Sequence, residues 1–201
     1  MRTAIFIDGA YLEFTLRESY ESVRIDYGQL SEKLAGGIDV LRSYYYNCLP
    51  YVGNPPTEEE KTRLADKQRF FDALTRIPRY QVRLGQLAFR GLRTGDNRPI
   101  FEQKRVDTLM AVDFVLLCST QRITHAALLT GDGDFVPAVN VAKEFGVVVS
   151  LWYSDRFRAD DELWRVCDER HVIDQALIDS IRLRTYPNGE FVRTGRSEPA
   201  V

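Results

Sequence analysis

The chain has 201 residues, of which 44% are hydrophobic and 28% are charged, so it is long enough to bury a core without disulfides. Its formal net charge of −2 predicts no nucleic-acid partner by itself. Three cysteines without a CxxC pair (Cys48, Cys118 and Cys167) argue against a disulfide framework and a zinc site, and no apolar run resembles a signal peptide or a membrane span. We therefore expect a soluble, cytoplasmic protein with no membrane partner.

Strands alternate with helices along the predicted chain. Apolar and β-branched runs predict strands at residues 2–7, 40–52, 79–91, 125–130, 147–153 and 171–174. Helices are predicted after residue 8 and at residues 58–77, 105–121, 135–145 and 160–168. Thr57 and Glu60 have the spacing of a capping box before the second of these helices. Residues 92–103 are expected to form a polar loop, and residues 184–201 a loosely held tail after a domain of residues 1–183.

In the strand at 79–91, Val82 and Leu84 are expected to face inward, with Leu87 and Phe89 as weaker candidates. Apolar strands that alternate with helices indicate an α/β fold with a parallel sheet covered on both faces. In such sheets, ligands bind outside the carboxyl ends of the strands.

Acidic residues follow two of the predicted strands at their carboxyl ends. Asp8 ends the first strand, and Asp132 and Asp134 come directly after the strand at 125–130. Asp107 lies at the start of the helix at 105–121, either as its cap or in its first turn. Asp113 lies six residues further on and is rotated by about 240° around the helix axis, so it faces another way.

Carboxylates that converge on one edge of a sheet need compensation. Two such charges at 4 Å repel by about 4 kcal/mol at an effective dielectric of about 20. Mg²⁺ or Mn²⁺ suits an all-oxygen ligand set, whereas the chain has only two histidines. Each aspartate alone is explained as a turn former or a helix cap, with Asp134 capping the helix at 135–145. Together on one edge, they favour a cation site. An EF-hand is excluded, because Lys143 stands where its twelfth position needs Glu.

Residues 76–105 form a basic segment. Eight basic residues against Asp96 and Glu102 give it a charge of 8 − 2 = +6. Its basic residues are Arg76, Arg79, Arg83, Arg90, Arg93, Arg98, Lys104 and Arg105. Such a segment predicts either a phosphate-binding surface or a solvated loop whose arginines pair with nearby acids.

Three stretches together resemble the NYN domain family, a branch of the PIN-like nuclease superfamily. They are FIDGAYL at 6–12, KRVDTLMAVD at 104–113 and LLTGDGDFVPAV at 128–139, followed by EFGVVV at 144–149. The resemblance implies a PIN-like three-layer α/β/α sandwich with a mainly parallel central sheet, an acidic Mg²⁺ or Mn²⁺ pocket and endoribonuclease activity. The residues that match the acids of the family are Asp8, Asp107, Asp113 and Asp132, with Asp134 as a supporting match. Tyr11 departs from the pattern, because many relatives have Asn there.

The hypothesis is therefore metal-assisted hydrolysis of RNA. Cations would be held by Asp8, Asp107, Asp132 and Asp134, and Asp113 would act behind them or on a second ion. Contacts to RNA are expected from Tyr11, Arg83, Arg90, Arg93, Lys104, Arg105 and Thr130. Stacking of a base on Tyr44, Tyr45 or Tyr46 competes with the simpler explanation that these tyrosines pack in the core.

Other functions remain as alternatives. The first is a catalytically inactive NYN domain that acts as an RNA-binding or protein-interaction module. The second is a DNA flap nuclease. An aspartyl phosphatase needs a second Asp where the chain has Ala10, and no glycine-rich nucleotide-binding loop is present. The sequence leaves open whether attack is internal or from an end, and whether the protein forms a homodimer.

Overall fold

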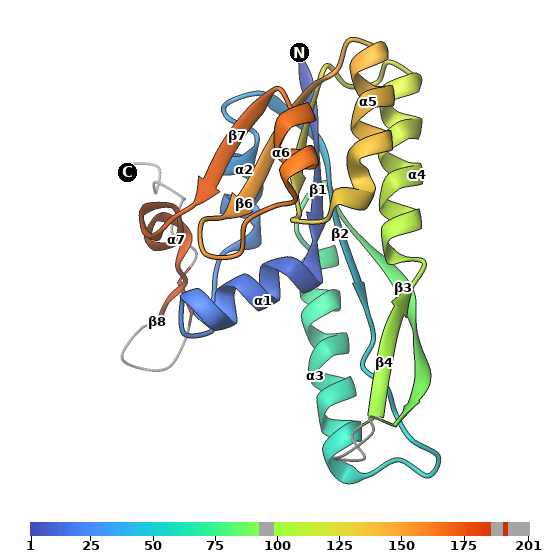
Figure 1. Cartoon of the computed structure of the whole chain (residues 1–201). Coiled ribbons are helices and arrows are strands. Elements are labelled where there is room, and N and C mark those ends of the chain that lie inside the picture. Colours follow the sequence, from blue (N-terminus) through green and yellow to red (C-terminus); the bar gives the residue numbers. More distant parts are fainter. Residues whose placement is uncertain (93–98, 186–190, 193–201) are drawn as a thin grey trace, which may run out of the picture.

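The computed structural model of the chain describes residues 1–92, 99–185 and 191–192, and within them seven strands form one sheet (Figure 1). The strand order is β4-β3-β2-β1-β5-β6-β7, and all neighbours are parallel except the pair of β3 and β4. The strands are β1 (Arg2–Asp8), β2 (Asp39–Cys48), β3 (Tyr80–Leu92), β4 (Pro99–Lys104), β5 (His125–Leu129), β6 (Val148–Ser154) and β7 (Glu169–Ile173). Six parallel strands with helices between them form the α/β sandwich that the sequence predicts.

Helices cover both faces of this sheet. The α-helices are α1 (Gly9–Ser19), α2 (Tyr27–Leu34), α3 (Glu58–Thr75), α4 (Val106–Ser119), α5 (Val136–Glu144), α6 (Asp161–Val166) and α7 (Gln175–Ile181). A short 3₁₀ turn, η1 (Gly133–Phe135), leads into α5.

The period-two alternation of β1 divides the core into two layers. Phe6 packs with α4, α5 and α6 on one face, whereas Ile5 and Ile7 pack with α1, α2, α3 and α7 on the other. The ring of Phe6 stacks on Tyr44 and meets Phe114 edge to face. The predicted packing role of the tyrosines is therefore confirmed for Tyr44, and Tyr45 and Tyr46 are fully buried as well.

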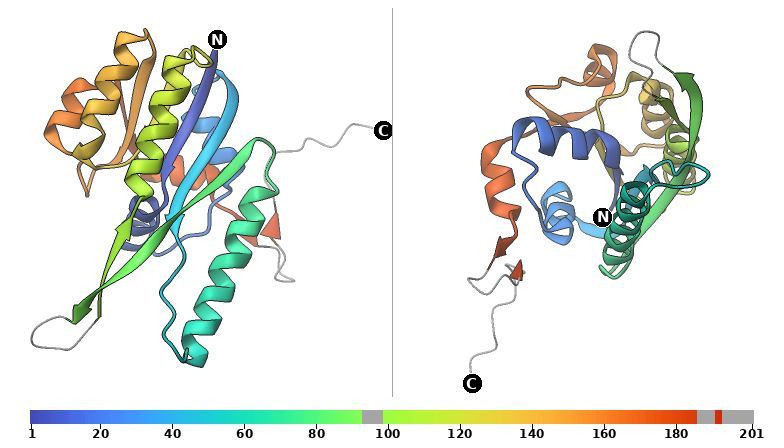
Figure 2. Two further views of the ribbon diagram at one scale, coloured as in Figure 1. Left: turned by 90° about the vertical axis from the view of Figure 1, so that its right-hand side faces the viewer. Right: turned by 90° about the horizontal axis from the view of Figure 1, so that it is seen from below.

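The carboxyl ends of the central strands lie where α1 begins. In Figure 1, α1 crosses the lower ends of β1 and β6, and the lower end of α4 approaches the same region. From there α3 and the hairpin of β3 and β4 extend away from the body as two arms (Figure 2). The ends of β1, β2 and β5 thus open towards the space beside these arms.

Several sequence predictions are confirmed and others are wrong. The capping box of Thr57 and Glu60 forms as predicted. The expected loop at 92–103 is wrong over its second half, because β4 pairs there with β3, and its Pro99 takes the first position of an edge strand, where no N–H is needed. Leu84 does not face inward but is 42% exposed, while the side chains of Leu87 and Phe89 lie outside the described part. The short helices α2 and α7 were not predicted, and α2 carries Gly28 in its first turn.

At the end of the chain, β8 (Arg184–Thr185) and β9 (Phe191–Val192) pair as short antiparallel strands. The rest of the predicted tail lies outside the described residues. In the ranges that the structure describes, no helix combines the length and apolar character needed to cross a bilayer.

Candidate active site

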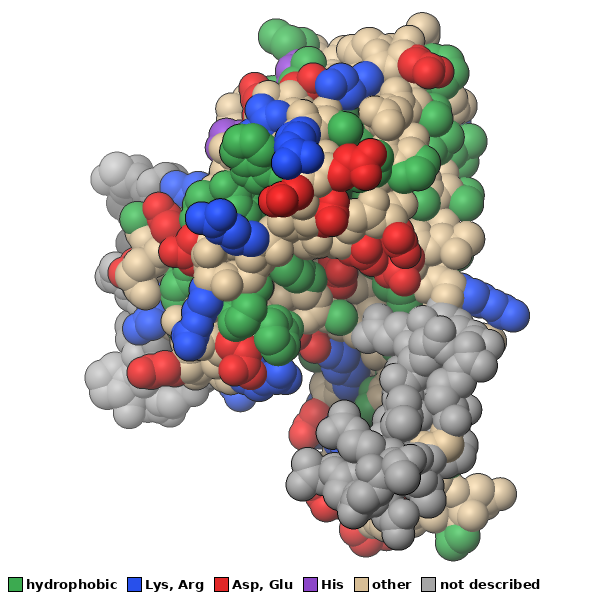
Figure 3. All heavy atoms as spheres, viewed as in Figure 1, with side chains coloured by type: hydrophobic (Ala, Val, Ile, Leu, Met, Phe, Trp, Pro, Cys, Tyr) green, Lys and Arg blue, Asp and Glu red, His purple; other side chains and the backbone are tan. Residues whose placement is uncertain are grey.

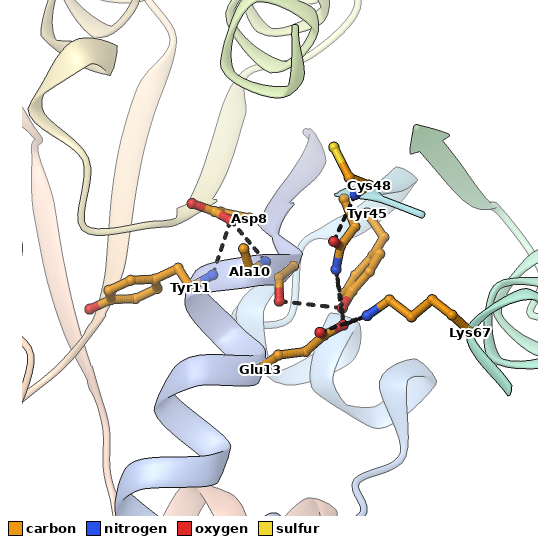
Figure 4. Close-up of polar contacts among 9 residues, drawn as sticks. Asp8, Ala10, Tyr11, Glu13, Tyr45, Cys48 and Lys67 are labelled. Atoms are coloured by element: carbon orange, nitrogen blue, oxygen red, sulfur yellow. Dashed lines mark hydrogen bonds and ion pairs between the residues drawn. The ribbon is translucent and has the colours of Figure 1, made fainter. Parts of the chain in front are cut away.

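Asp8 links the end of β1 to the start of α1. One carboxylate oxygen, Oδ1, accepts hydrogen bonds from the backbone N–H groups of Ala10 at 3.0 Å and Tyr11 at 3.1 Å, which caps the helix (Figure 4). The other oxygen, Oδ2, accepts from the hydroxyl of Thr130 at 3.2 Å. Both oxygens of Asp8 are therefore fixed in direction.

Thr130 joins the ends of β1 and β5. This fully buried residue donates its hydroxyl to Asp8, and the same oxygen accepts from the backbone N–H of Asp132 at 3.2 Å. Asp132 in turn caps η1, because its Oδ1 accepts from the N–H of Asp134 at 2.9 Å. The sequence suggested that Asp134 caps α5, but it lies inside η1 and Asp132 is the capping residue.

The two glycines of this turn are required by close packing. A Cβ atom on Gly131 would lie 2.7 Å from Cε2 of Tyr11, and one on Gly133 would lie 2.7 Å from Cγ of Asp160. Only glycine lets the turn pass between these side chains.

The pKa values of two of these acids, Asp8 and Asp107, are raised. Burial is the main cause that raises the pKa of the Asp8 carboxyl, and the charge of Asp107 adds to it against the opposing hydrogen bonds. Asp107 lies in the first turn of α4, and its side chain reaches solvent. Desolvation, followed by the charges of Asp132 and Asp134, raises the pKa of its carboxyl. Asp8, Asp107, Asp132 and Asp134, which we call the acidic centre, thus come together from three separate segments.

No cation balances this charge in the described part of the chain. None of the four aspartates forms an ion pair with a Lys or Arg there. In the space-filling view, acidic side chains gather where the starts of α1 and α4 approach each other (Figure 3). The described residues nevertheless contain no group of three or more Asp, Glu, His or Cys side chains close enough to hold a metal ion. The charges of these carboxylates therefore influence one another's titration at Asp8 and Asp107, but the side chains are not arranged as a complete metal coordination sphere in the described part.

Asp113 has a different environment. Its Oδ2 accepts a hydrogen bond from the hydroxyl of Tyr46 at 3.0 Å and lies 3.1 Å from Nε of Arg83. Asp113 does not contribute to the raised pKa of Asp8 or Asp107. The expected rotation of Asp113 away from Asp107 is confirmed, and the structure joins Asp113 to Arg83 instead of to the acidic centre.

Tyr11 is held in place by the backbone around β6. Its hydroxyl donates to the carbonyl oxygen of Phe157 at 2.6 Å and accepts from the N–H of Ser154 at 2.9 Å. Because its ring also faces Gly131, Tyr11 ties α1 to the two loops that surround the acidic centre.

Glu13 is the centre of a polar network that the sequence did not reveal. It accepts hydrogen bonds from Tyr45 at 2.6 Å and from Nδ2 of the buried Asn47 at 2.9 Å. Nζ of Lys67 on α3 lies 2.6 Å from its Oε2 (Figure 4). Asn47 lies at the carboxyl end of β2. Its role could have been predicted from the rule that ligands bind outside the carboxyl ends of parallel strands. Lys67 is 54 residues from Glu13, and no local pattern links the two.

The predicted basic segment does not form one phosphate-binding face in the described part. Arg79 pairs with Asp39 at the amino end of β2, and Arg83 pairs with Asp113. Arg105 is exposed and takes a left-handed conformation with φ of 72° directly before α4. The side chains of Arg76 and Arg105 are described, whereas those of Arg90, Arg93, Arg98 and Lys104 lie outside the described residues.

Two further hollows lie apart from the polar network. The larger, of about 940 Å³, is at the amino ends of β2 and β3 and includes Asp26 and Tyr80. None of the four aspartates of the acidic centre lines it. An apolar groove of about 690 Å³ runs between the exposed sides of α4 and α5, and its lining includes Asp107 and Asp134.

A parallel α/β sheet with aspartates at the carboxyl edge is the architecture of a PIN-like domain. The family model for the NYN domain matches residues 2–175, so the chain belongs to the NYN domain family of that nuclease-like superfamily. No curated protein matches the chain.

Solved structures extend the comparison of the fold. A protein of unknown function, VPA0982 from Vibrio parahaemolyticus RIMD 2210633, is 19% identical with a TM-score of 0.59, over 87% of this chain and 93% of that one. The complex of Glycyrrhiza uralensis UGT73P12 with glycyrrhetinic acid 3-O-monoglucuronide is 13% identical, over 77% of this chain and 28% of that one. Its TM-score of 0.35 is too low to indicate a shared fold. The first of these supports the fold alone.

Proposed function

We propose that the protein is a divalent-metal-dependent endoribonuclease that hydrolyses RNA phosphodiester bonds at the acidic centre. The observation that carries this proposal is the convergence of aspartates from the ends of β1 and β5 and the start of α4. The Thr130 hydroxyl joins Asp8 to the backbone of Asp132, and the charges of Asp132 and Asp134 act on Asp107. Membership of a nuclease-like family agrees with it. Like charges that are partly desolvated and have no protein cation beside them in the described part are costly unless a ligand balances them.

The donor chemistry of the acidic centre fits Mg²⁺ or Mn²⁺. All of its side-chain donors are oxygens, which hard divalent cations prefer. Asp8, Asp107, Asp132 and Asp134 would hold the ion. When bound, a divalent cation lowers the pKa of water and stabilises negative charge on phosphoryl oxygens, so no histidine base is required.

The surrounding residues orient the acids. The N–H groups at the start of α1 hold one oxygen of Asp8, and Thr130 holds the other. The N–H of Asp134 fixes Asp132. We propose that Thr130 acts as the positioning residue between the two strand ends, and that Asp113 positions Arg83 and Tyr46 without touching the cation.

We propose that RNA lies across the exposed side of the acidic centre. Arg105, exposed two residues before Asp107, supports this placement because a guanidinium there would meet a phosphate. Arg83 is a weaker contact than the sequence suggested, because Asp113 balances its charge. Arg90, Arg93 and Lys104 stay sequence predictions.

The experiment compares Asp8→Asn and Asp132→Asn with the parent in Mn²⁺-dependent cleavage of single-stranded RNA. Asn still caps a helix, so both variants should fold. A matched control is Asp26→Asn, because Asp26 caps α2 through two N–H groups as Asp8 caps α1, and its charge is not among the causes that raise the pKa of Asp8 or Asp107. We expect loss of at least 100-fold in kcat (about 2.7 kcal/mol) for the two site variants and parental activity for the control. Cleavage by either site variant at the parental rate would refute the assignment.

The substrate and the mode of attack are tested in the same assay. A circular RNA reports internal cleavage, since it has no end to attack. A parallel DNA flap substrate separates a ribonuclease from a structure-specific DNA nuclease. The proposal expects products from circular RNA and none from the flap.

The alternative is a catalytically inactive domain that binds RNA or a protein. The lack of a finished metal-ligand cluster among the described residues favours this alternative. Divalent-cation binding without turnover of any RNA would establish it.

We propose a cytoplasmic location. Cys48, Cys118 and Cys167 are buried free thiols, which a reducing compartment preserves.

A further inference from the structure

A cavity of about 560 Å³ lies between α1, the end of β2 and α3. Its volume is within the range of about 300–1,000 Å³ that holds small ligands. The residues that line it are Glu13, Tyr27, Asn47, Cys48, Leu49, Pro50, Arg63, Asp66, Lys67 and Phe70.

The cavity begins beside the acidic centre. Tyr46 is the register partner of Asp8 on the neighbouring strand, and Asn47 and Cys48 follow it directly. Burial, and then the charge of Asp107, raise the pKa of the Cys48 thiol. Glu13 lies five residues after Asp8 on α1 and reaches into the cavity from the other side.

The charged groups of the lining are already occupied. Lys67 is paired with Glu13, Arg63 donates to the carbonyl oxygen of Tyr51, and Asp66 is paired with Arg69. Two positive and two negative side chains also cancel in the lining. The cavity is therefore poorly suited to attract a phosphate group.

The remaining lining suits a flat, apolar ligand with polar edges. Tyr27, Leu49, Pro50 and the partly buried Phe70 supply apolar surface, and Asn47 lies at the strand end with its amide held by Glu13. Nζ of Lys67 lies over the ring of Phe70, 5.5 Å from its centroid, and a stacking base would take over this position, because every base has a π-face. Single-stranded RNA is recognised by splaying out bases into pockets of this kind.

We infer that this cavity, which we call the base pocket, takes the splayed-out base of a nucleotide next to the phosphate at the acidic centre. The inference rests on the proposed function, since it places RNA across the same edge of the sheet. The backbone of the strand would pass the acids while one neighbouring base enters between α1 and α3.

The test uses short single-stranded RNAs that carry one 2-aminopurine, placed at successive positions, bound to Asp132→Asn protein. We expect a large fluorescence change at a single position of the strand. Leu49→Trp on this background fills the pocket and should abolish that change and weaken RNA binding roughly 5-fold to 160-fold, the range for one stacked base. Glu59→Trp, which adds the same side chain on the exposed first turn of α3, is the matched control and should bind as before.

Phe70→Leu is the second variant, because it keeps apolar volume and removes the aromatic face. It should weaken RNA binding. Because the variant also loses ring contacts with Tyr27, Tyr45 and Phe71, its melting temperature is measured first, and binding is compared well below it. Equal fluorescence at all positions, or parental affinity in both Leu49→Trp and Phe70→Leu, would overturn the base pocket.

The two proposals fail separately. RNA cleavage without a position-specific signal would refute the base pocket and leave the nuclease. A position-specific signal that Leu49→Trp abolishes, together with no RNA cleavage by the parent protein, would support the pocket and refute the nuclease.

Discussion

Removing one carboxylate from the acidic centre should abolish cation-induced stabilisation while leaving the fold almost unchanged. Asp132→Asn keeps the cap on the N–H of Asp134, since Asn caps as well as Asp. It also removes the charge of Asp132 that raises the pKa of Asp107. Without cations, the variant should differ from the parent by no more than about 0.5 kcal/mol, as for other partly exposed substitutions.

With cations, the two proteins should diverge. A ligand that binds only the native state stabilises it by about 2.7 kcal/mol at 100 times its Kd. For a domain of this length, about 2–4 °C per kcal/mol gives a rise in Tm of roughly 5–11 °C for the parent. Asp26→Asn should retain this rise and Asp132→Asn should lose most of it. Thermal melts over a MnCl₂ titration measure the difference. An equal rise in all three proteins, or none in the parent, would show that Asp132 does not hold a stabilising cation.

Three further predictions concern the surroundings of the acidic centre. Thr130→Val removes the hydroxyl that joins Asp8 to the N–H of Asp132 and should cost about 1–3 kcal/mol in urea unfolding. Thr130→Ser should recover most of the loss, and equal losses would contradict the role of the hydroxyl. Tyr11→Phe leaves the N–H of Ser154 without its acceptor and should cost about 1–3 kcal/mol in thermal melts, so unchanged stability would contradict it. In cation-free buffer, the raised pKa of Asp8 makes its ionised form destabilising. The stability of the parent relative to Asp8→Asn should therefore fall as pH rises from below the unfolded pKa of roughly 3.9 through the raised folded value, and a difference independent of pH would refute this.

The sequence predicts the edge of the sheet on which the acids meet. Asp8 and Asp132 follow apolar strands, and parallel strands bring their carboxyl ends together whatever their separation in sequence. The structure adds that both residues also cap helical turns. The capping role and the proposed role in the acidic centre are therefore compatible, because the capping hydrogen bonds fix the directions of the carboxylates.

Contacts that depend on tertiary structure were not predictable. Glu13 looks like an exposed helical residue, and only the position of α3 gives it Lys67 as a partner. The same holds for Arg83 on β3, which forms an ion pair with Asp113 on α4, the helix that covers this face of the sheet. The charge count along residues 76–105 considered only neighbouring acids as partners, whereas the partner of Arg83 lies 30 residues away in a different element.

The prediction of secondary structure from the sequence failed where local signals were weak. The helix α2 has eight residues with Gly28 in its first turn, so propensity gives little support to it. The strand β4 begins with Pro99 and is held by pairing with β3, which periodicity does not report.

The most direct measurement is an anomalous difference map from crystals of the parent soaked in MnCl₂. We expect a peak within coordination distance of Asp8 and of at least one of Asp107 and Asp132, and no such peak in Asp132→Asn crystals. A map without a peak beside Asp8, or with peaks only elsewhere on the molecule, would contradict a shared cation at the acidic centre.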